Sequence, residues 1–308
     1  FFNLSFAQSY DDLISQAEKQ YQDQAYEEST KTYLQAFDLK TDQSAGDLYN
    51  AACSAALSGD DQTAFVLLDK SYKAGYSNAR HLKQDSDLQS LHDQKKWKRL
   101  TARVQRKLDK IESAYNKPLQ QELLRIYEDD QQIRREFISA ANELGWEHPT
   151  VDSLGKIMSH LDSINLERTI LILDEYGWVG PSLVGGQASQ SLFLVIQHAD
   201  LETQQKYLPM MRTAVEKGDA NTKSLALLED RVALREGRKQ IYGSQIGRNP
   251  DTNEQYVLPL EDPDNVDVRR AKMGLGTMQE YVSRWNLTWD ATVYKSRLAE
   301  YESWYQKE

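Results

Sequence analysis

Hydrophobic side chains recur at helical spacing along most of the chain, and the stretch after residue 118 shows this spacing throughout. Its apolar positions are Leu119, Leu123, Ile126, Ile133, Phe137, Ala140 and Leu144. Steps of three, four and seven place these side chains on one face of an amphipathic helix. Asn116 and Lys117 interrupt the preceding pattern, and Pro118 suits a first helical turn, where its missing N–H is no loss. We therefore expect a long helix that opens a second domain at residue 116.

Shorter segments with the same spacing predict further helices, and one segment predicts strands. Helices are expected at 151–161, at 166–173, through Phe193 to Ile196, after the N-caps Asp200 and Thr222, at 264–272, at 277–285, and in the tail 286–308. Residues 240–246 and 255–260 flank a turn-rich loop, which is the pattern of a hairpin. The expected fold class is mainly α, with a helical second domain at 116–285 that carries one β-hairpin near 240–260.

The first third of the chain predicts two helical hairpins of one kind. A shift of 64 − 29 = 35 positions aligns three residues of the first hairpin with three of the second: Ser29, Tyr33 and Ala36 with Ala64, Leu68 and Ser71. With the stretch Tyr49-Asn50-Ala51-Ala52-Cys53, the segment resembles bacterial tetratricopeptide-repeat proteins, whose period is about 34 residues. The resemblance implies a tetratricopeptide-like helical repeat domain at 10–115, closed by the basic helix 95–114, with a groove for a protein or peptide partner.

Residues 1–9 form a separate segment in this interpretation. The chain opens Phe1-Phe2-Asn3-Leu4-Ser5-Phe6-Ala7-Gln8. An apolar stretch that ends in a small-x-small triplet is typical of the tail of a secretory signal peptide. We therefore expect an exported protein, in the periplasm, the cell envelope or the medium. The alternative is a cytoplasmic protein with a hydrophobic N-terminal arm.

Charge and composition exclude several classes of partner. The 37 basic and 47 acidic side chains give a formal net charge of −10. An acidic surface repels nucleic acid and anionic lipid, so the basic helix 95–114 is interpreted as a solvated face. No apolar run approaches the roughly 18 residues of a transmembrane segment. Cys53 is the one cysteine, which leaves it without an intrachain disulfide partner, and among alanines it is expected in the core.

Six polar blocks in the second domain carry another resemblance. They are Asp130-Gln131-x-x-Arg134, Tyr176-Gly177-Trp178, Gln197-His198-Ala199-Asp200, Asp230-Arg231-Val232, Gln240-x-Tyr242-Gly243-Ser244-Gln245, and Glu261-Asp262-Pro263 with Asp267-x-Arg269-Arg270. In order and spacing they resemble a bacterial family known only as a domain of unknown function, number six-six-two-four. The resemblance implies no established activity.

The blocks supply the candidate site residues. His198 is the candidate catalytic residue, because histidine is the usual general acid or base near neutral pH. The candidates for ligand binding are Asp130, Arg134, Gln197, Asp200, Asp230, Arg231, Tyr242 and Gln245. In this interpretation the side chains meet in one hollow, where Asp200 or Asp230 orients the imidazole. In the alternative interpretation they form ion pairs, cap helices and satisfy backbone groups.

Local spacing predicts no metal site and no cofactor. His198 and Asp200 are two positions apart and would point to different faces of a helix, and the other histidines show no ligand spacing. Gly185-Gly186 lacks the lysine of a phosphate-binding loop. Gly243-Ser244-Gln245 misplaces the serine for a nucleophile elbow.

Two functions remain open at the level of sequence. The first is a protein- or peptide-binding scaffold whose second domain holds a small polar ligand or another partner. The second is a hydrolase or peptide-modifying enzyme that uses His198 as general acid or base. We favour the first, because the sequence contains repeats and no recognised catalytic constellation.

Overall fold

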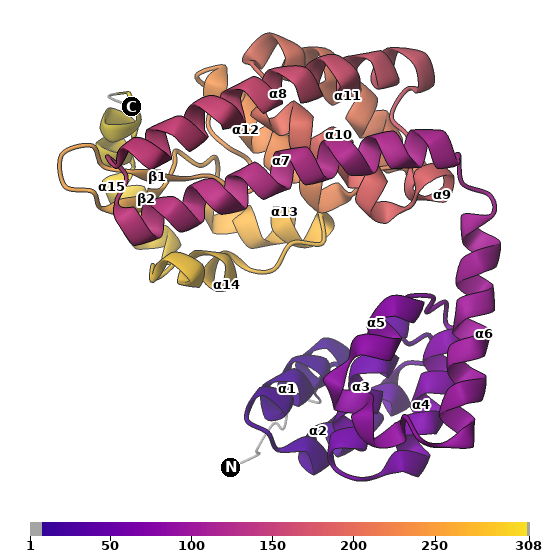
Figure 1. The fold of residues 1–308 in the computed structure, drawn as a ribbon. Helices are drawn as coiled ribbons and strands as arrows, with labels where there is room; N and C mark the ends of the chain where they lie inside the picture. The colour runs from indigo at the N-terminus through magenta and orange to yellow at the C-terminus, as the bar shows by residue number, and fades with distance from the viewer. Residues whose placement is uncertain (1–7, 307–308) are drawn as a thin grey trace, which may run out of the picture. The chain divides into compact units, whose positions relative to one another are not determined.

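The computed structural model describes residues 8–306, so most of the predicted signal remnant lies outside the described residues. The chain divides into two units, Phe1–Ser113 and Ala114–Glu308, which are described here one at a time (Figure 1). Both are built mainly of helices, and one antiparallel pair of strands is present among the described residues. This agrees with the predicted fold class. Within residues 8–306, every helix is too short or too polar to span a membrane.

The first unit is a stack of helices. Its elements are α1 (Tyr10–Gln22), α2 (Tyr26–Leu39), α3 (Ala45–Leu57), α4 (Asp61–Lys73), α5 (Ala79–Gln84), the 3-10 helix η1 (Ser86–Leu91) and α6 (Lys95–Glu112). Helix α1 packs against α2, and α3 packs against α4, with further contact between α2 and α3. Helix α6 packs against α4 and α5. This arrangement is compatible with the predicted tetratricopeptide-like hairpins, which remain an expectation.

Two serines, Ser29 and Ser71, are buried between these helices. The Ser29 hydroxyl donates a hydrogen bond to the carbonyl oxygen of Ala17 at 2.8 Å and lies 3.0 Å from the Ser54 hydroxyl. The Ser71 hydroxyl donates to the carbonyl oxygen of Ala45 at 2.7 Å. Each hydroxyl is small enough for close helix packing and finds a backbone acceptor, so its burial leaves no unpaired polar group.

The second unit starts with two long helices that run side by side (Figure 1). Its elements are α7 (Lys117–Leu144), α8 (Pro149–Tyr176), α9 (Pro181–Val184), α10 (Gly186–His198), α11 (Leu201–Lys217), α12 (Thr222–Arg235), β1 (Ile246–Arg248), β2 (Gln255–Val257), η2 (Pro263–Asn265), α13 (Val266–Lys272), α14 (Met278–Val282), η3 (Ser283–Trp285) and α15 (Ala291–Tyr305). Helix α10 packs against α7, α8, α11 and α12. The core of the unit therefore surrounds the most apolar helix.

One helix prediction was wrong. The segments 151–161 and 166–173 were expected to form two helices, but α8 is continuous from Pro149 to Tyr176. The polar residues between Leu161 and Leu166 include no glycine or proline, so nothing interrupts the backbone hydrogen bonds there. Asn221, rather than Thr222, caps α12, because its side chain accepts hydrogen bonds from the backbone N–H groups of the first turn.

The β-hairpin is present, but it is shorter than predicted and shifted along the chain. Ile246 lies opposite Val257, and Gly247 lies opposite Tyr256. Most of the segment 240–245 is not strand, because the carboxylate of Asp230 accepts hydrogen bonds from several of its backbone N–H groups. Those donors are therefore withdrawn from any β-ladder.

The C-terminal helix packs onto this hairpin region. The Tyr294 hydroxyl donates a hydrogen bond to the carbonyl oxygen of Leu258 at 2.9 Å and accepts one from the backbone N–H of Leu260 at 2.8 Å. The Tyr301 ring stacks on the Tyr256 ring with their centroids 5.2 Å apart. The predicted tail 286–308 therefore contributes α15 to the core of the second unit.

Candidate functional site

Three helices bring four polar side chains together in the second unit. Asp130 and Arg134 lie one turn apart on α7, Asp162 lies on α8, and His198 is the last residue of α10. The Nη2 atom of Arg134 lies 3.1 Å from Asp130 Oδ1, 2.6 Å from Asp162 Oδ1 and 2.7 Å from His198 Nδ1. We call these four residues the Arg134 cluster. The guanidinium is its common centre.

The two carboxylates of the Arg134 cluster have opposite pKa shifts. Asp130 is only 1% exposed, and burial acts to raise its pKa, but hydrogen bonds from Gln131 and Arg134 and the charge of Arg134 act against burial, and the pKa lies below its ordinary value. Burial raises the pKa of Asp162, against the lowering effect of the nearby Arg134 charge. Asp130 is thus the firmly ionised partner of the arginine. Asp130 and Arg134 thus form an ion pair, which is one of the roles that the alternative interpretation gave to the candidate residues.

The position of Arg134 decides which nitrogen of His198 carries the proton. A guanidinium only donates hydrogen bonds, so His198 Nδ1, at 2.7 Å from Arg134 Nη2, must accept one. The neutral imidazole then has its proton on Nε2. Asp130 Oδ1 lies 3.3 Å from His198 Nδ1, and both atoms accept hydrogen bonds from Arg134. His198 Nε2–H has no hydrogen-bond partner among residues 8–306 and is available as a donor to a ligand.

A second group of predicted residues surrounds Arg231. Its Nη1 donates to the carbonyl oxygen of Gln197 at 2.8 Å, and its Nη2 lies 3.4 Å from Gln245 Oε1. Burial lowers the pKa of the Arg231 guanidinium, and the positive charges of Arg235 and Arg134 act in the same direction. In the described part of the chain no carboxylate forms an ion pair with Arg231, so this group carries a net positive charge.

The remaining candidates have structural roles. Asp230 is 0% exposed, and its oxygens accept hydrogen bonds from the backbone N–H groups of Ile241 at 2.6 Å, Tyr242 at 2.9 Å and Ser244 at 2.9 Å. Burial raises the pKa of Asp230 against the effect of these bonds. Asp200 is exposed and caps α11 through the backbone N–H of Thr203. These are the capping and backbone-satisfying roles that the structural interpretation gave them.

Tyr242 points toward another acidic side chain. Its hydroxyl donates to Glu229 Oε2 at 3.1 Å, and burial, followed by the Glu229 charge, raises the pKa of Tyr242 to about 12. Hydrogen bonds therefore place the candidate residues in two groups, the Arg134 cluster and the residues around Arg231. The sequence had predicted that they meet in a single hollow. The two groups approach each other where Arg231 binds the carbonyl of Gln197, the residue before His198.

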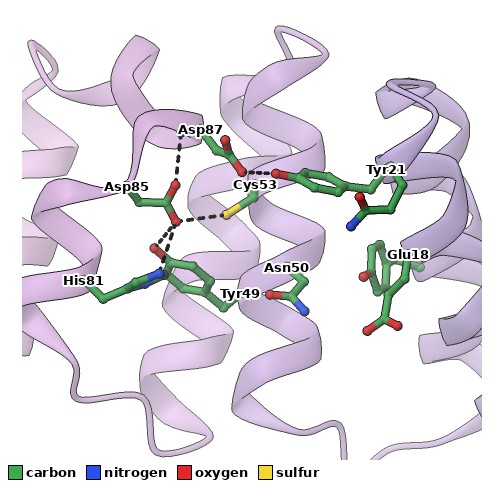
Figure 2. Close-up of a pocket in the computed structure, with 10 residues that line it drawn as sticks. Glu18, Tyr21, Tyr49, Asn50, Cys53, His81, Asp85 and Asp87 are labelled. Atoms are coloured by element: carbon green, nitrogen blue, oxygen red, sulfur yellow. Dashed lines mark hydrogen bonds and ion pairs between the residues drawn. The ribbon is translucent and has the colours of Figure 1, made fainter. Parts of the chain in front are cut away.

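The first unit holds a cavity of about 460 Å³ that no candidate from the sequence had indicated. Figure 2 shows its side chains directed into the space between α1 on one side and the α5–η1 segment on the other, with α3 between them. The cavity is lined by Glu18, Tyr21, Gln22, Tyr33, Tyr49, Asn50, Cys53, His81, Asp85 and Asp87. We call it the α3 pocket. Its lining includes three carboxylates and three tyrosines, and no lysine or arginine.

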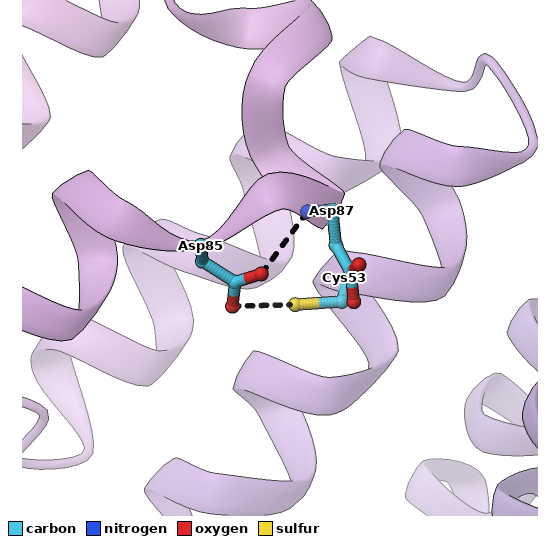
Figure 3. Close-up of side chains that lie close together, drawn as sticks. All are labelled: Cys53, Asp85 and Asp87. Atoms are coloured by element: carbon cyan, nitrogen blue, oxygen red, sulfur yellow. Dashed lines mark hydrogen bonds between the residues drawn. The ribbon is translucent and has the colours of Figure 1, made fainter.

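Hydrogen bonds hold the two aspartates of the α3 pocket in place. The Tyr49 hydroxyl donates to Asp85 Oδ2 at 2.7 Å, and the Tyr21 hydroxyl donates to Asp87 Oδ2 at 2.5 Å. Asp85 Oδ1 accepts from the backbone N–H of Asp87 at 3.0 Å. The Cys53 thiol lies 3.7 Å from Asp85 Oδ2, and Figure 3 marks this contact with a dashed line. Burial, and then the charges of Asp85 and Asp87, raise the pKa of the Cys53 thiol.

Two groups of side chains among the described residues have donor atoms close enough to share a metal ion. One is Asp130, Asp162 and His198, and the other is Cys53, Asp85 and Asp87. Spacing along the sequence predicted neither, because their members come from separate segments of the fold. In the first group the position between the ligand atoms is held by Arg134, whose guanidinium bonds all three residues. A cation is therefore already present there.

Comparison with known protein families agrees with the second resemblance. A family model described as a family of unknown function, DUF6624, matches residues 117–295, which is more than half of the 308 residues. The chain belongs to this family. The DUF6624 region contains the Arg134 cluster and the Arg231 group, whereas the α3 pocket precedes it in the chain. No curated protein and no solved structure matches the chain.

Proposed function

We propose that this DUF6624 protein is a binding protein whose first unit captures a cationic segment of a protein or peptide partner in the α3 pocket. The observation that carries the proposal is the lining of that pocket, in which Glu18, Asp85 and Asp87 face a cavity of about 460 Å³. Ligand cavities commonly measure about 300–1,000 Å³, so a basic side chain and part of its backbone fit. The helical-repeat resemblance supports the same function, because repeat stacks present concave binding surfaces.

The charge of the α3 pocket favours a cation. Within residues 8–306, Glu18, Asp85 and Asp87 form no ion pair with a lysine or arginine. The one basic side chain in the lining is His81, whose Nε2 lies 4.0 Å from Asp85 Oδ2. A lysine ammonium or arginine guanidinium that enters the pocket can therefore make charge-assisted hydrogen bonds, each worth about 1.5–3 kcal/mol when partly desolvated.

The aromatic lining favours the same class of ligand. Tyr33 is 1% exposed and Tyr49 is 4% exposed, so both rings are held rigidly in the walls. The partly exposed ring of Tyr21 can attract a cation to its face by about 0.5–2 kcal/mol. Aromatic rings also cover the aliphatic stem of a lysine or arginine. The combination of fixed rings and carboxylates without a lysine or arginine partner recognises a basic side chain in an extended segment better than it recognises an acidic or apolar one.

Peptide selection on the intact protein tests this proposal while the partner is unidentified. A random peptide library displayed on phage is selected against the wild type and against the double variant Glu18→Gln, Asp87→Asn. The control is Asp38→Asn, which removes an exposed carboxylate from α2 outside the pocket. We expect enrichment of lysine and arginine with the wild type and the control, and its loss with the double variant. Enrichment of peptides without basic residues, or the same basic peptides from the double variant, would refute the proposal.

A second candidate function rests on one observation in the second unit. His198 Nδ1 is fixed by Arg134, and its Nε2–H is left without a partner among the described residues. A histidine in this tautomer can donate a proton or a hydrogen bond to a bound substrate, as a general acid does. The nearby guanidinium of Arg231 would hold an anionic or carbonyl oxygen. The hydrolase or peptide-modifying activity suggested by the sequence would use these groups.

The enzyme alternative is tested by comparing the wild type with His198→Ala on a panel of ester, peptide and phosphoester substrates. Glu202→Gln serves as the control, because it changes an exposed charge on α11 that is not among the candidate residues. Circular dichroism verifies the fold of each variant. Activity that falls at least 100-fold in His198→Ala and stays unchanged in the control supports this function. Equal activity in all three proteins excludes catalysis by His198 on those substrates.

A further inference from the structure

The α3 pocket contains a compact group of side chains with three different kinds of metal-binding donor. We propose that Cys53, Asp85 and Asp87, with His81 beside them, bind a divalent transition metal ion of the zinc class. The sulfur and carboxylate donors of the first three residues all lie within 4.8 Å of one another. This inference does not depend on capture of a cationic partner, and a metal ion held by Asp85 and Asp87 would compete with a basic side chain for the same carboxylates.

The distances fit tetrahedral coordination with little movement. Zinc binds thiolate sulfur at about 2.3 Å and carboxylate oxygen at about 2.0 Å, which places two such ligands about 3.5 Å apart at a tetrahedral angle. The observed separation of Cys53 Sγ and Asp85 Oδ2 is 3.7 Å. His81 Nε2 lies 4.0 Å from the same oxygen, and side-chain rotation alone can shorten this distance, because His81 is exposed.

The donor set selects the class of metal. Thiolate and imidazole ligands favour zinc, cobalt and related ions, whereas calcium and magnesium require mainly oxygen ligands. Cys53 supplies the sulfur from α3, and His81 supplies the imidazole from α5. Asp85 and Asp87 flank the start of η1 and supply oxygen. A site with three or four such ligands beside an open cavity keeps room for a water molecule or a ligand group on the metal.

Outer hydrogen bonds orient the oxygen ligands of this site. The hydroxyls of Tyr49 and Tyr21 donate to Asp85 and Asp87, respectively. In metal sites such second partners fix the direction of the ligating groups. Figure 3 shows Asp85 extended toward the Cys53 sulfur, with Asp87 beside them. Cys53 is 4% exposed, so its sulfur is held in the wall of the pocket and does not rotate into solvent.

The contrast with the Arg134 cluster strengthens the assignment. Asp130, Asp162 and His198 also lie at metal-binding distances, but Arg134 donates hydrogen bonds to all of them. In the pocket of the first unit no lysine or arginine of the described residues occupies the equivalent position. The carboxylate charges there remain uncompensated, and a divalent ion would balance them.

Metal titration of the full chain tests the proposal. The protein is purified without a polyhistidine tag, treated with a chelator, and titrated with Co²⁺ and then with Zn²⁺ alone. We expect one Co²⁺ per chain, with a near-ultraviolet thiolate-to-cobalt charge-transfer band that one equivalent of Zn²⁺ abolishes. In Cys53→Ala the band should be absent and Zn²⁺ affinity should fall at least tenfold. Alanine suits this alanine-rich helix, and circular dichroism verifies that the variant folds.

Two further variants keep the test decisive. Asp87→Asn retains the sulfur, so the charge-transfer band should persist while Zn²⁺ binds at least fivefold more weakly. Asp162→Asn alters the other group and should leave both signals unchanged. The proposal is overturned if Co²⁺ gives no charge-transfer band with the wild type, or if Zn²⁺ affinity is the same in the wild type and Asp87→Asn. Because the titration uses no peptide, its failure would leave the proposed capture of a cationic segment standing.

Discussion

Replacing Asp230 with alanine tests the structural role assigned to this buried carboxylate. In the wild type its two oxygens accept three backbone N–H groups, from Ile241, Tyr242 and Ser244. Those bonds determine the course of the chain between α12 and β1. Alanine removes every acceptor at once, and asparagine keeps one carbonyl oxygen while placing an amide N–H₂ where the second oxygen was.

The expected effect follows from the number of donors left unpaired. A buried donor without a partner costs about 1–3 kcal/mol, and three donors would sum to about 3–9 kcal/mol. Water that enters the vacated space satisfies some of them, and removal of a buried charge returns part of its desolvation cost. We therefore expect Asp230→Ala to lower the free energy of unfolding by about 3 kcal/mol and Asp230→Asn to lower it by about 1–2 kcal/mol.

Urea unfolding and hydrogen exchange measure this prediction together. The free energy of unfolding comes from far-ultraviolet circular dichroism, and exchange by mass spectrometry reports the amides of residues 241–244. Glu202→Gln, an exposed change on α11, is the control. The loop amides should exchange at least tenfold faster in Asp230→Ala. If both Asp230 variants stay within about 0.5 kcal/mol of the control and the loop exchange is unchanged, the assigned role is wrong.

Two other changes give separate tests of the second unit. The pKa of Asp130 is held below its ordinary value of 3.8, so its stabilising effect is complete above about pH 5 and is lost as pH falls through the folded-state pKa. The stability difference between wild type and Asp130→Asn should therefore shrink between about pH 5 and pH 3, and a difference that grows on acidification would contradict this sign. Gly243 has φ +70°, and a Cβ there would lie 2.7 Å from the sulfur of Met278, whereas Gly237 has φ +74° and open space around it. Gly243→Ala should cost about 1–3 kcal/mol more in unfolding free energy than Gly237→Ala, and equal losses would mean that the contact with Met278 relaxes freely.

Helical periodicity predicted much of the fold, and the errors have identifiable physical causes. The expected break between Leu161 and Leu166 lies inside α8, and this segment contains Asp162, which binds Arg134. Asp162 is polar because it binds Arg134 of α7, and this polar position was taken for the end of a helix. The misplaced strand at 240–245 has a similar cause, because Asp230 takes the backbone donors that a strand would use.

The candidate residues were predicted only where the chemistry was local. Asp130 and Arg134 are one turn apart, so their ion pair followed from helix geometry. The α3 pocket had no such signal, since Cys53 and Asp85 are separated by 32 positions and meet only through the packing of α3 against η1. The four-residue spacing of His81 and Asp85 is a signal that the sequence interpretation missed when it found no ligand spacing among the other histidines.

The dependence of partner binding on a single positive charge is the most direct test of the proposed function. A lysine-containing peptide recovered by selection on the wild type is compared, by isothermal titration calorimetry, with the same peptide carrying N-acetyl-lysine at that position. Acetylation removes the charge and preserves the aliphatic stem. Capture of a cation in the α3 pocket predicts at least tenfold weaker binding of the acetylated peptide, which corresponds to about 1.4 kcal/mol. Equal affinities would show that the carboxylates of the α3 pocket do not recognise a cation.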